Sequence, residues 1–365
     1  MIAVGILHRL YTRHAAAVWQ AETRLLHRLG YVRPPRAVQW LATSMCDLHC
    51  PHCYSHAGKR SPDELDVDEA KTHILDELVA LGRPNLVIAG GEALLRRDFE
   101  AIVAHAHRRK IPWALHTHGG RVDALIDVFE RYPPVMVAVS LDGPRAYHDS
   151  FRGREGSFAA AVAAITALKR IGVPEVVTGT TVNRDNADLL ADMIPDVLAT
   201  GADSWGFHLV TPEGRAGQGR AMLPTAAQLR RVAGLARRLR ALIHVELDNE
   251  WGSAGDDDCF YRDQPFLCGA GRHVCVITPT GEVVPCTTTD RRESHGNVRT
   301  RRLRDIWADG FAAFREAGDR VKADGLDSWL QTRNGHSCRR PAFFGAPGTE
   351  LGDAPLVTLR TGGAS

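Results

Sequence analysis

The stretch VQWLATSMCDLHCPHC, residues 38–53, joins a short apolar run to three closely spaced cysteines. The apolar part, Val38–Thr43, has the length of a buried strand. Cys46, Cys50 and Cys53 follow it with the spacing C-x3-C-x2-C. Cubane iron–sulfur clusters are ordinarily held by four cysteine thiolates. Three thiolates therefore indicate a [4Fe-4S] cluster whose fourth iron is kept open for an exchangeable cofactor or substrate.

Two other interpretations of this loop stay open at the level of the motif. Cys50-Pro51-His52-Cys53 alone is a C-x-x-C dithiol of the oxidoreductase type, which would leave Cys46 without a use. A zinc site would need a fourth ligand, for which His49, His52 and His56 are available. The rest of the chain has to decide between the three interpretations.

The composition is that of a globular chain with a large core. With 365 residues, 44% of them hydrophobic, it can form one large domain with an appended module, or two domains. No stretch approaches membrane-spanning length, and no basic region precedes the short apolar run Met1–Leu7. We therefore expect a cytoplasmic protein, in which the 8 cysteines favour metal or redox chemistry over structural disulfides.

Five arginines lie close together in the second half of the chain. They are Arg230, Arg231, Arg237, Arg238 and Arg240. Because apolar residues alternate with them at helical spacing, this run is typical of the solvated face of an amphipathic helix. The net charge of +2 indicates no particular partner. We expect neither a nucleic acid nor a membrane partner.

Residues 37 to about 210 alternate short apolar runs with helical patterns, which is typical of a parallel α/β architecture. The predicted strands are Val38–Thr43, Leu86–Ala89, Trp113–His116, Val135–Leu141, Val176–Val182 and Trp205–Val210. Helices predicted between them include Val67–Leu81 and Ser157–Ile171. Six such units predict a partial (β/α)6 TIM barrel.

The segments around this barrel complete the predicted domain organisation. Residues 1–36 form a helical lead-in that ends at Gly30, and residues 37–242 form the barrel. Residues 243–345 form a cysteine-rich module with a β-hairpin, Val274–Ile277 and Glu282–Val284, and a helix, Leu303–Glu316. The Gly/Pro-rich tail, residues 346–365, is expected to be poorly ordered.

Polar and glycine-containing segments follow the C-terminal ends of all six predicted strands. In strand order they are Cys46, Cys50 and Cys53; Gly90-Gly91-Glu92; Thr117-His118-Gly119; Ser140-Leu141-Asp142-Gly143; Asn183 and Asn186; and Gly214-Arg215. Parallel barrels carry their functional groups on these loops. The sequence therefore predicts one functional site at the mouth of the barrel.

These motifs, in this order, resemble those of the radical S-adenosylmethionine (SAM) superfamily, and the resemblance covers nearly the whole chain. In that family the three-cysteine loop holds a [4Fe-4S] cluster whose open iron binds the amino and carboxylate groups of SAM. The resemblance implies that Cys46, Cys50 and Cys53 are the catalytic metal ligands. It implies that Gly90, Gly91 and Glu92 accept the SAM amino group, and that His52 stacks near the adenine.

A second run extends the resemblance. Family members carry Ser-Leu-Asp-Gly and then His-Asp-x-x-Arg-Gly, and this chain has them at 140–143 and 148–153. By that resemblance Ser140 and Arg152 touch the ribose or carboxylate of SAM. Singly, such segments could also be turns, helix starts or surface cations. His118 stands where relatives often have Asn, and it is either a structural or a substrate-facing residue.

The C-terminal module resembles the SPASM/twitch extension, in which C-x(9–15)-G-x4-C and later cysteines bind auxiliary clusters. Here Cys268, Gly281 and Cys286 fit that spacing. The resemblance implies one auxiliary [4Fe-4S] cluster, on Cys268, Cys275, Cys286 and Cys338. Scattered buried thiols or a zinc knuckle are the alternatives. Cys259 is left over, and it could quench a substrate radical, replace a ligand or have no role.

The resemblance implies an oxidoreductase that cleaves SAM to a 5′-deoxyadenosyl radical, which abstracts hydrogen from a substrate. The overall order of motifs is most similar to SPASM/twitch enzymes that mature peptides, such as the mycofactocin and pyrroloquinoline quinone maturases. Peptide modification in natural product biosynthesis is thus the first expectation, with flavodoxin or ferredoxin as electron donor. Oxidation or epimerisation of a small molecule, such as an aminoglycoside precursor, is the alternative. A non-catalytic iron–sulfur electron carrier is a third, against which the intact Gly90-Gly91-Glu92 motif argues.

Overall fold

The computed structural model describes residues 31–211, 213–216, 222–248, 251, 268–287 and 293–315, together with isolated residues between 18 and 29. Cys259, Cys338, the predicted tail and most of the predicted lead-in helix lie outside the described residues. Within the part that is described, no helix has both the length and the apolar content that crossing a membrane requires.

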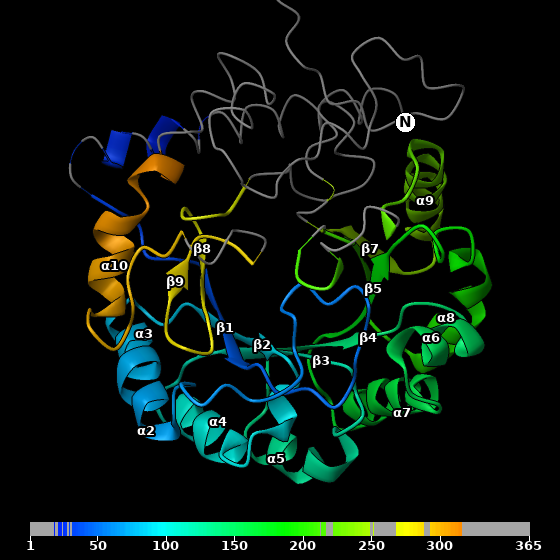
Figure 1. The fold of residues 1–365 in the computed structure, drawn as a ribbon, viewed down its shortest axis with the longest axis horizontal. Helices are drawn as coiled ribbons and strands as arrows, with labels where there is room; N and C mark the ends of the chain where they lie inside the picture. The colour runs from blue at the N-terminus through cyan, green and yellow to red at the C-terminus, as the bar shows by residue number, and fades with distance from the viewer. Residues whose placement is uncertain are drawn as a thin grey trace, which may run out of the picture.

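One curved sheet of nine strands forms the framework, and helices cover its outer side (Figure 1). The strand order is β7-β6-β5-β4-β3-β2-β1-β8-β9. The strands are β1 Ala37–Thr43, β2 Asn85–Gly90, β3 Trp113–Thr117, β4 Met136–Ser140, β5 Val176–Val182, β6 Ser204–Leu209, β7 His244–Leu247, β8 Val274–Ile277 and β9 Val283–Val284. All neighbours from β7 to β8 pair in parallel, and β8 pairs with β9 antiparallel. The predicted partial barrel is confirmed.

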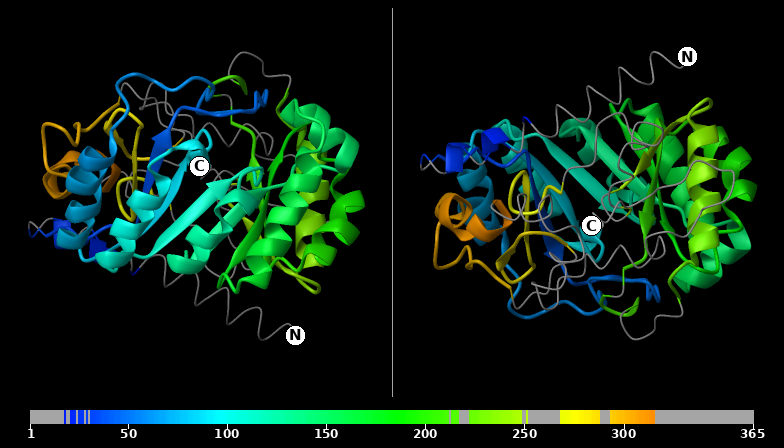
Figure 2. Two further views of the ribbon diagram at one scale, coloured as in Figure 1. Left: turned by 90° about the horizontal axis from the view of Figure 1, so that it is seen from below. Right: turned by 90° about the horizontal axis from the view of Figure 1, so that it is seen from above.

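Helices and helical turns connect the strands along the outside (Figure 2). They are α2 Val67–Glu69, η1 Ala70–Leu75, α3 Asp76–Ala80, η2 Ala93–Leu95, α4 Phe99–Arg108, η3 Asp123–Leu125, α5 Ile126–Arg131, α6 Arg145–Arg152, α7 Ser157–Arg170, η4 Leu190–Met193, α8 Ile194–Thr200, α9 Ala226–Leu239 and α10 Leu303–Gly310. The predicted helix Val67–Leu81 forms, but its middle, η1, is π-helical. Four of the five clustered arginines lie in the amphipathic helix α9, as predicted, and Arg240 is its C-cap residue.

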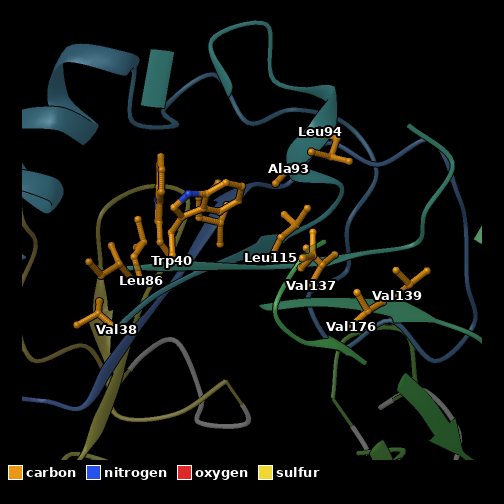
Figure 3. Close-up of a cluster of buried hydrophobic side chains, with 14 of the residues drawn as sticks. Val38, Trp40, Leu86, Ala93, Leu94, Leu115, Val137, Val139 and Val176 are labelled. Carbon is orange, nitrogen blue, oxygen red and sulfur yellow. The ribbon is translucent and has the colours of Figure 1, made fainter. Parts of the chain in front are cut away.

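The core lies mainly between the sheet and these helices. Side chains from successive strands, including Val38, Leu86 and Val137, gather in one cluster (Figure 3). On the opposite face of β1, Leu41 packs with Ala89 of β2. Strands buried on both faces have nearly continuous apolar sequences, which explains the runs seen in the sequence. Each large apolar side chain buried there contributes about 1.5–3 kcal/mol.

The C-terminal hairpin is part of the barrel sheet. Strand β8 pairs with β1 in parallel, with Cys275 opposite Val38. Arg299, beyond the hairpin, forms a bidentate ion pair with Glu69 at 2.7 and 2.9 Å, and donates to the Asp63 carbonyl at 3.0 Å. The hydrogen bonds from Arg299 hold the pKa of Glu69 at about 2. These contacts fasten the C-terminal segment to the barrel helices.

Candidate functional site

A cavity of about 250 Å³ opens where the strands end. Its lining contains most of the predicted site residues: Cys46, Cys50, His52, Cys53, Gly90, Gly91, Thr117, His118, Ser140, Arg152 and Arg215. Glu92, Asp142, Asn183 and Asn186 are fully buried and lie outside this lining. The loops after separate parallel strands therefore meet at one place, as barrel geometry requires.

The three-cysteine loop is held by backbone contacts and by one buried carboxylate. The Cys46 N–H donates to the Gly58 carbonyl at 2.9 Å, which closes the loop at its start. Glu64 is buried, and it accepts hydrogen bonds from the Ser44 N–H at 2.7 Å and from the Thr43 hydroxyl at 2.8 Å. Burial raises the pKa of the Cys46 thiol to about 11. Ligation of a metal at this loop would thus release protons, because thiolates are the ligand form.

The segment after β6 is hydrogen-bonded to the cysteine loop. Arg215 donates to the carbonyl of Cys50 at 2.8 Å and to the carbonyl of Ala57 at 2.5 Å, and its backbone N–H donates to Cys53 O at 3.0 Å. Gly214 has a φ of +56°, and a Cβ there would lie 2.3 Å from Cys53 O. Only glycine permits this approach without displacing the backbone. The predicted Gly214-Arg215 pair thus braces the cysteine loop.

His52 sits at the end of a stack of rings. Its ring lies 4.7 Å from the Phe151 ring at an interplanar angle of 7°, and Phe151 stacks on Tyr147 at 5.2 Å. The Tyr147 hydroxyl donates to Asn183 Oδ1 at 3.0 Å. Burial lowers the pKa of His52 to about 4, so the ring is neutral at pH 7. Its buried Nδ1 has no hydrogen-bond partner among the described residues.

Glu92 braces the cavity wall from behind. Its Oε2 accepts hydrogen bonds from the Thr117 hydroxyl at 2.8 Å and from the His118 N–H at 3.0 Å, and its Oε1 accepts from the Leu94 N–H at 3.2 Å. The Gly120 N–H donates to His118 Nδ1, which assigns the ring proton of a neutral His118 to Nε2. His118 Nε2 lies 2.9 Å from Asp47 Oδ1 and 3.2 Å from Glu92 Oε2. His118 thereby joins the cysteine loop to the segment after β2.

Arg152 and Asp142 form a buried ion pair next to the loop. Arg152 Nε donates to Asp142 Oδ2 at 2.7 Å, and Arg152 Nη1 lies 3.7 Å from the Cys50 sulfur. Asp142 also accepts a hydrogen bond from the Thr181 N–H at 2.9 Å. Burial alone would raise the pKa of Asp142, but Arg152, the neighbouring histidines and the Thr181 N–H together outweigh it, and the pKa falls to about 2. The pair is therefore ionised at neutral pH.

The cavity lining also contains His116, His208 and Asp248, which were not predicted as site residues from the sequence. His208 Nδ1 lies 2.6 Å from Asp248 Oδ2. Burial lowers the pKa of His116 to about 4. In β6 the side chains of Trp205, Phe207 and Leu209 belong to the core cluster, so by alternation His208 points to the inner face. A histidine at an inward position near the end of a barrel strand is the signal that could have identified it.

Three of the four predicted auxiliary cysteines belong to the described residues, and Cys275 lies in β8, between β1 and β9. Cys268 and Cys286 are half-buried, and Cys275 of β8 is fully buried. Burial raises the pKa of the Cys275 thiol to about 12. Thr287, the neighbour of Cys286, lines the cavity described above. The C-terminal segment therefore reaches the rim of the barrel site.

Comparison with known proteins gives two matching families and several relatives. The family described as the radical SAM superfamily matches residues 40–205, and an iron–sulfur cluster-binding domain, SPASM, matches residues 268–339. An AdoMet-dependent heme synthase from Oleidesulfovibrio alaskensis is 29% identical over 344 residues, 89% of this chain and 87% of that protein. Mycofactocin maturase MftC from Mycobacterium ulcerans is 32% identical over 286 residues, 73% of this chain and 72% of that protein.

Solved structures are similar in fold. Streptococcus suis SuiB bound to its precursor peptide SuiA matches with a TM-score of 0.61 at 14% identity, over 80% of this chain and 69% of that one. At this identity the likeness concerns the fold alone.

Proposed function

We propose that this chain, which belongs to the radical SAM superfamily, is an enzyme that cleaves SAM and uses the radical to modify a peptide. The observation that carries the proposal is the position of the three-cysteine loop. Its sulfur ligands line one cavity together with the segments after β2, β3 and β4. A cluster bound there would face the space in which a cofactor and a substrate could meet.

The family implies a [4Fe-4S] cluster and SAM, and the SPASM domain implies auxiliary iron–sulfur clusters. The residues present fit these groups. Three thiols at one cavity wall leave one iron of a cubane without a protein ligand. The buried, unpartnered Nδ1 of His52 offers a hydrogen-bonding position that a bound heteroaromatic base can use.

When bound, the reduced cluster supplies the electron that splits SAM into methionine and a 5′-deoxyadenosyl radical, which abstracts hydrogen from the substrate. In the proposal Cys46, Cys50 and Cys53 hold the cluster, and His52 and Ser140 contact SAM. Gly90 and Gly91 accept the SAM amino group through their backbone oxygens. Glu92 supports that segment through its hydrogen bonds to Thr117 and His118.

We assign the substrate end of the cavity to His116, His208 and Asp248. His208 Nδ1 lies 2.6 Å from Asp248 Oδ2, and a carboxylate at this position orients the ring and stabilises its protonated form. A Cβ on Gly179 or Gly206 would lie 3.5 or 3.8 Å from Nε2, so these glycines leave room beside it. His208 is therefore suited to accept a proton from a substrate group.

Peptide modification is supported by maturase relatives such as MftC, and by SkfB, a sporulation killing factor maturation protein. A haem precursor is the second candidate substrate, because heme synthases align over 87–99% of their own length. The proposal also includes a cytoplasmic location, a flavodoxin or ferredoxin as electron donor, and one auxiliary cluster on Cys268, Cys275, Cys286 and Cys338. We also propose that, in the sequence, the barrel ends at residue 242 and the cysteine-rich module begins at residue 243.

The test uses anaerobically reconstituted, reduced protein with SAM. We expect 5′-deoxyadenosine and methionine in equal amounts, and no 5′-deoxyadenosine from the Cys50→Ala variant. Turnover of the variant at the parental rate would refute the proposed function. Mass spectrometry with candidate precursor peptides and with haem precursors then decides between the two substrates, because only the true substrate changes mass.

A further inference from the structure

The Arg152–Asp142 ion pair touches the cysteine loop at one sulfur atom. The two side chains are 9% and 0% exposed, and Nε and Nη2 of Arg152 lie 2.7 and 2.5 Å from Asp142 Oδ2. The remaining nitrogen, Nη1, donates to the Cys50 sulfur at 3.7 Å. Each guanidinium nitrogen therefore has a partner within the chain.

We propose that Arg152 is a positioning residue for the iron–sulfur cluster. Its guanidinium presents a fixed positive charge to the Cys50 sulfur and so raises the reduction potential of the cluster. This inference rests on the proposed function. It differs from the contact with the ribose or carboxylate of SAM that the family resemblance implies for Arg152. The step affected is the uptake of one electron by the oxidised cluster, in which no bond or proton changes place.

The direction of the effect follows from charge. Reduction adds one negative charge to a cluster whose protein ligands are anionic, and a nearby cation stabilises the more negative state. Because the pair is buried, solvent screens this interaction only weakly. The negative charge of Asp142 lowers the reduction potential, but its effect is the smaller one because Arg152 lies between the Asp142 carboxylate and the Cys50 sulfur. At the Cys50 thiol, burial raises the pKa, Arg152 counteracts this, and Asp142 adds to it.

Two substitutions separate this role from a general structural one, because they should shift the potential in opposite directions. In an EPR-monitored titration of the cluster without SAM, Arg152→Gln should lower the reduction potential and Asp142→Asn should raise it. We expect the reduced-to-oxidised ratio at fixed potential to change by about tenfold, which is 59 mV for a one-electron couple. Arg152→Lys keeps the charge and should shift the potential less.

Arg154→Gln is the matched control. Arg154 pairs with Asp47 of the same loop at 2.7 Å, but its side chain is 43% exposed. Solvent should therefore screen its charge, and the potential should stay near the parental value.

Shifts of the reduction potential in opposite directions in Arg152→Gln and Asp142→Asn support the proposal, since damage to the cysteine loop would shift the potential of both variants in the same direction. If Arg152→Gln holds no cluster, Asp142→Asn decides, because a potential that is unchanged or lowered overturns the proposal. If both variants keep the parental potential while Arg152→Gln weakens SAM binding in calorimetry, Arg152 is a SAM ligand and the proposal is wrong. A parent protein without a cluster at this loop contradicts the proposed function as well, so the two failures are distinguishable.

Discussion

Gly91→Ala should disable the site by a steric effect whose size follows from the structure. A Cβ on Gly91 would lie 2.1 Å from the carbonyl oxygen of Met45, the residue before Cys46. Carbon and oxygen atoms that are not bonded need more than about 3 Å, so the two segments must separate by roughly 1 Å. Both are backbone, and they are tied by hydrogen bonds of 2.7 Å from Gly91 N to Thr43 O and from Glu92 N to Met45 O. Neither segment can turn away as a side chain would.

The expected cost is about 1–3 kcal/mol of stability and about a hundredfold lower rate of SAM cleavage, because a 1 Å misplacement of reacting groups has effects of that order. The assay is anaerobic 5′-deoxyadenosine formation, with iron content measured on the same samples. Gly58→Ala is the matched control, since a Cβ there meets no heavy atom within 4 Å although Gly58 closes the same loop. A Gly91→Ala variant with the parental rate and iron content would refute this reasoning.

Three further predictions concern the substrate end, the C-terminal segment and the auxiliary cluster. His208→Gln should leave SAM cleavage without substrate unchanged but slow substrate conversion by about a hundredfold or more, the usual effect of losing a general base; equal losses in both assays would contradict the role. Arg299→Ala should lower the free energy of unfolding by about 1 kcal/mol. Because the pKa of Glu69 is lowered from 4.5 in the unfolded chain to about 2, the ion pair contributes its full stability above pH 4.5 and loses it only as the pH falls toward 2. The stability lost in Arg299→Ala, measured by thermal unfolding, should therefore be the same from about pH 6 to 8. A stability loss that varies across that range would be inconsistent with the pair. A variant with Cys46, Cys50 and Cys53 all replaced by alanine should keep about four irons per chain, and replacing Cys338 as well should remove them; an iron-free triple variant would rule out the second site.

The fold was predictable where burial shapes the sequence locally. Strands β1 to β6 were placed to within a residue or two, because a strand buried on both faces is a short apolar run between polar turns. Strand β7 was missed because it is a four-residue edge strand with exposed His244 and Glu246. The parallel pairing of Ala37 with Val274 depends on contacts across the whole chain, which local patterns do not contain.

The same limit applies to the site. The loops after the strands were predicted to meet, because barrel topology alone brings them together. The partners of each side chain were not predictable from the motifs. Glu92 accepts hydrogen bonds from Thr117 and His118 at the end of β3, and Arg152 contacts a cysteine 102 positions earlier in the chain. The pairing of His208 with Asp248 joins two strand ends that no motif connects.

The most direct test of the central claim is whether SAM binds to an iron of the cluster held by Cys46, Cys50 and Cys53. The measurement is electron–nuclear double resonance on the reduced protein, with SAM labelled at its amino nitrogen and carboxylate oxygen. We predict that both labels couple to the cluster spin in the parent protein, and that the coupling disappears in the Cys50→Ala variant. A reduced parent cluster that shows no coupling to either label, at saturating SAM, would contradict the open-iron site.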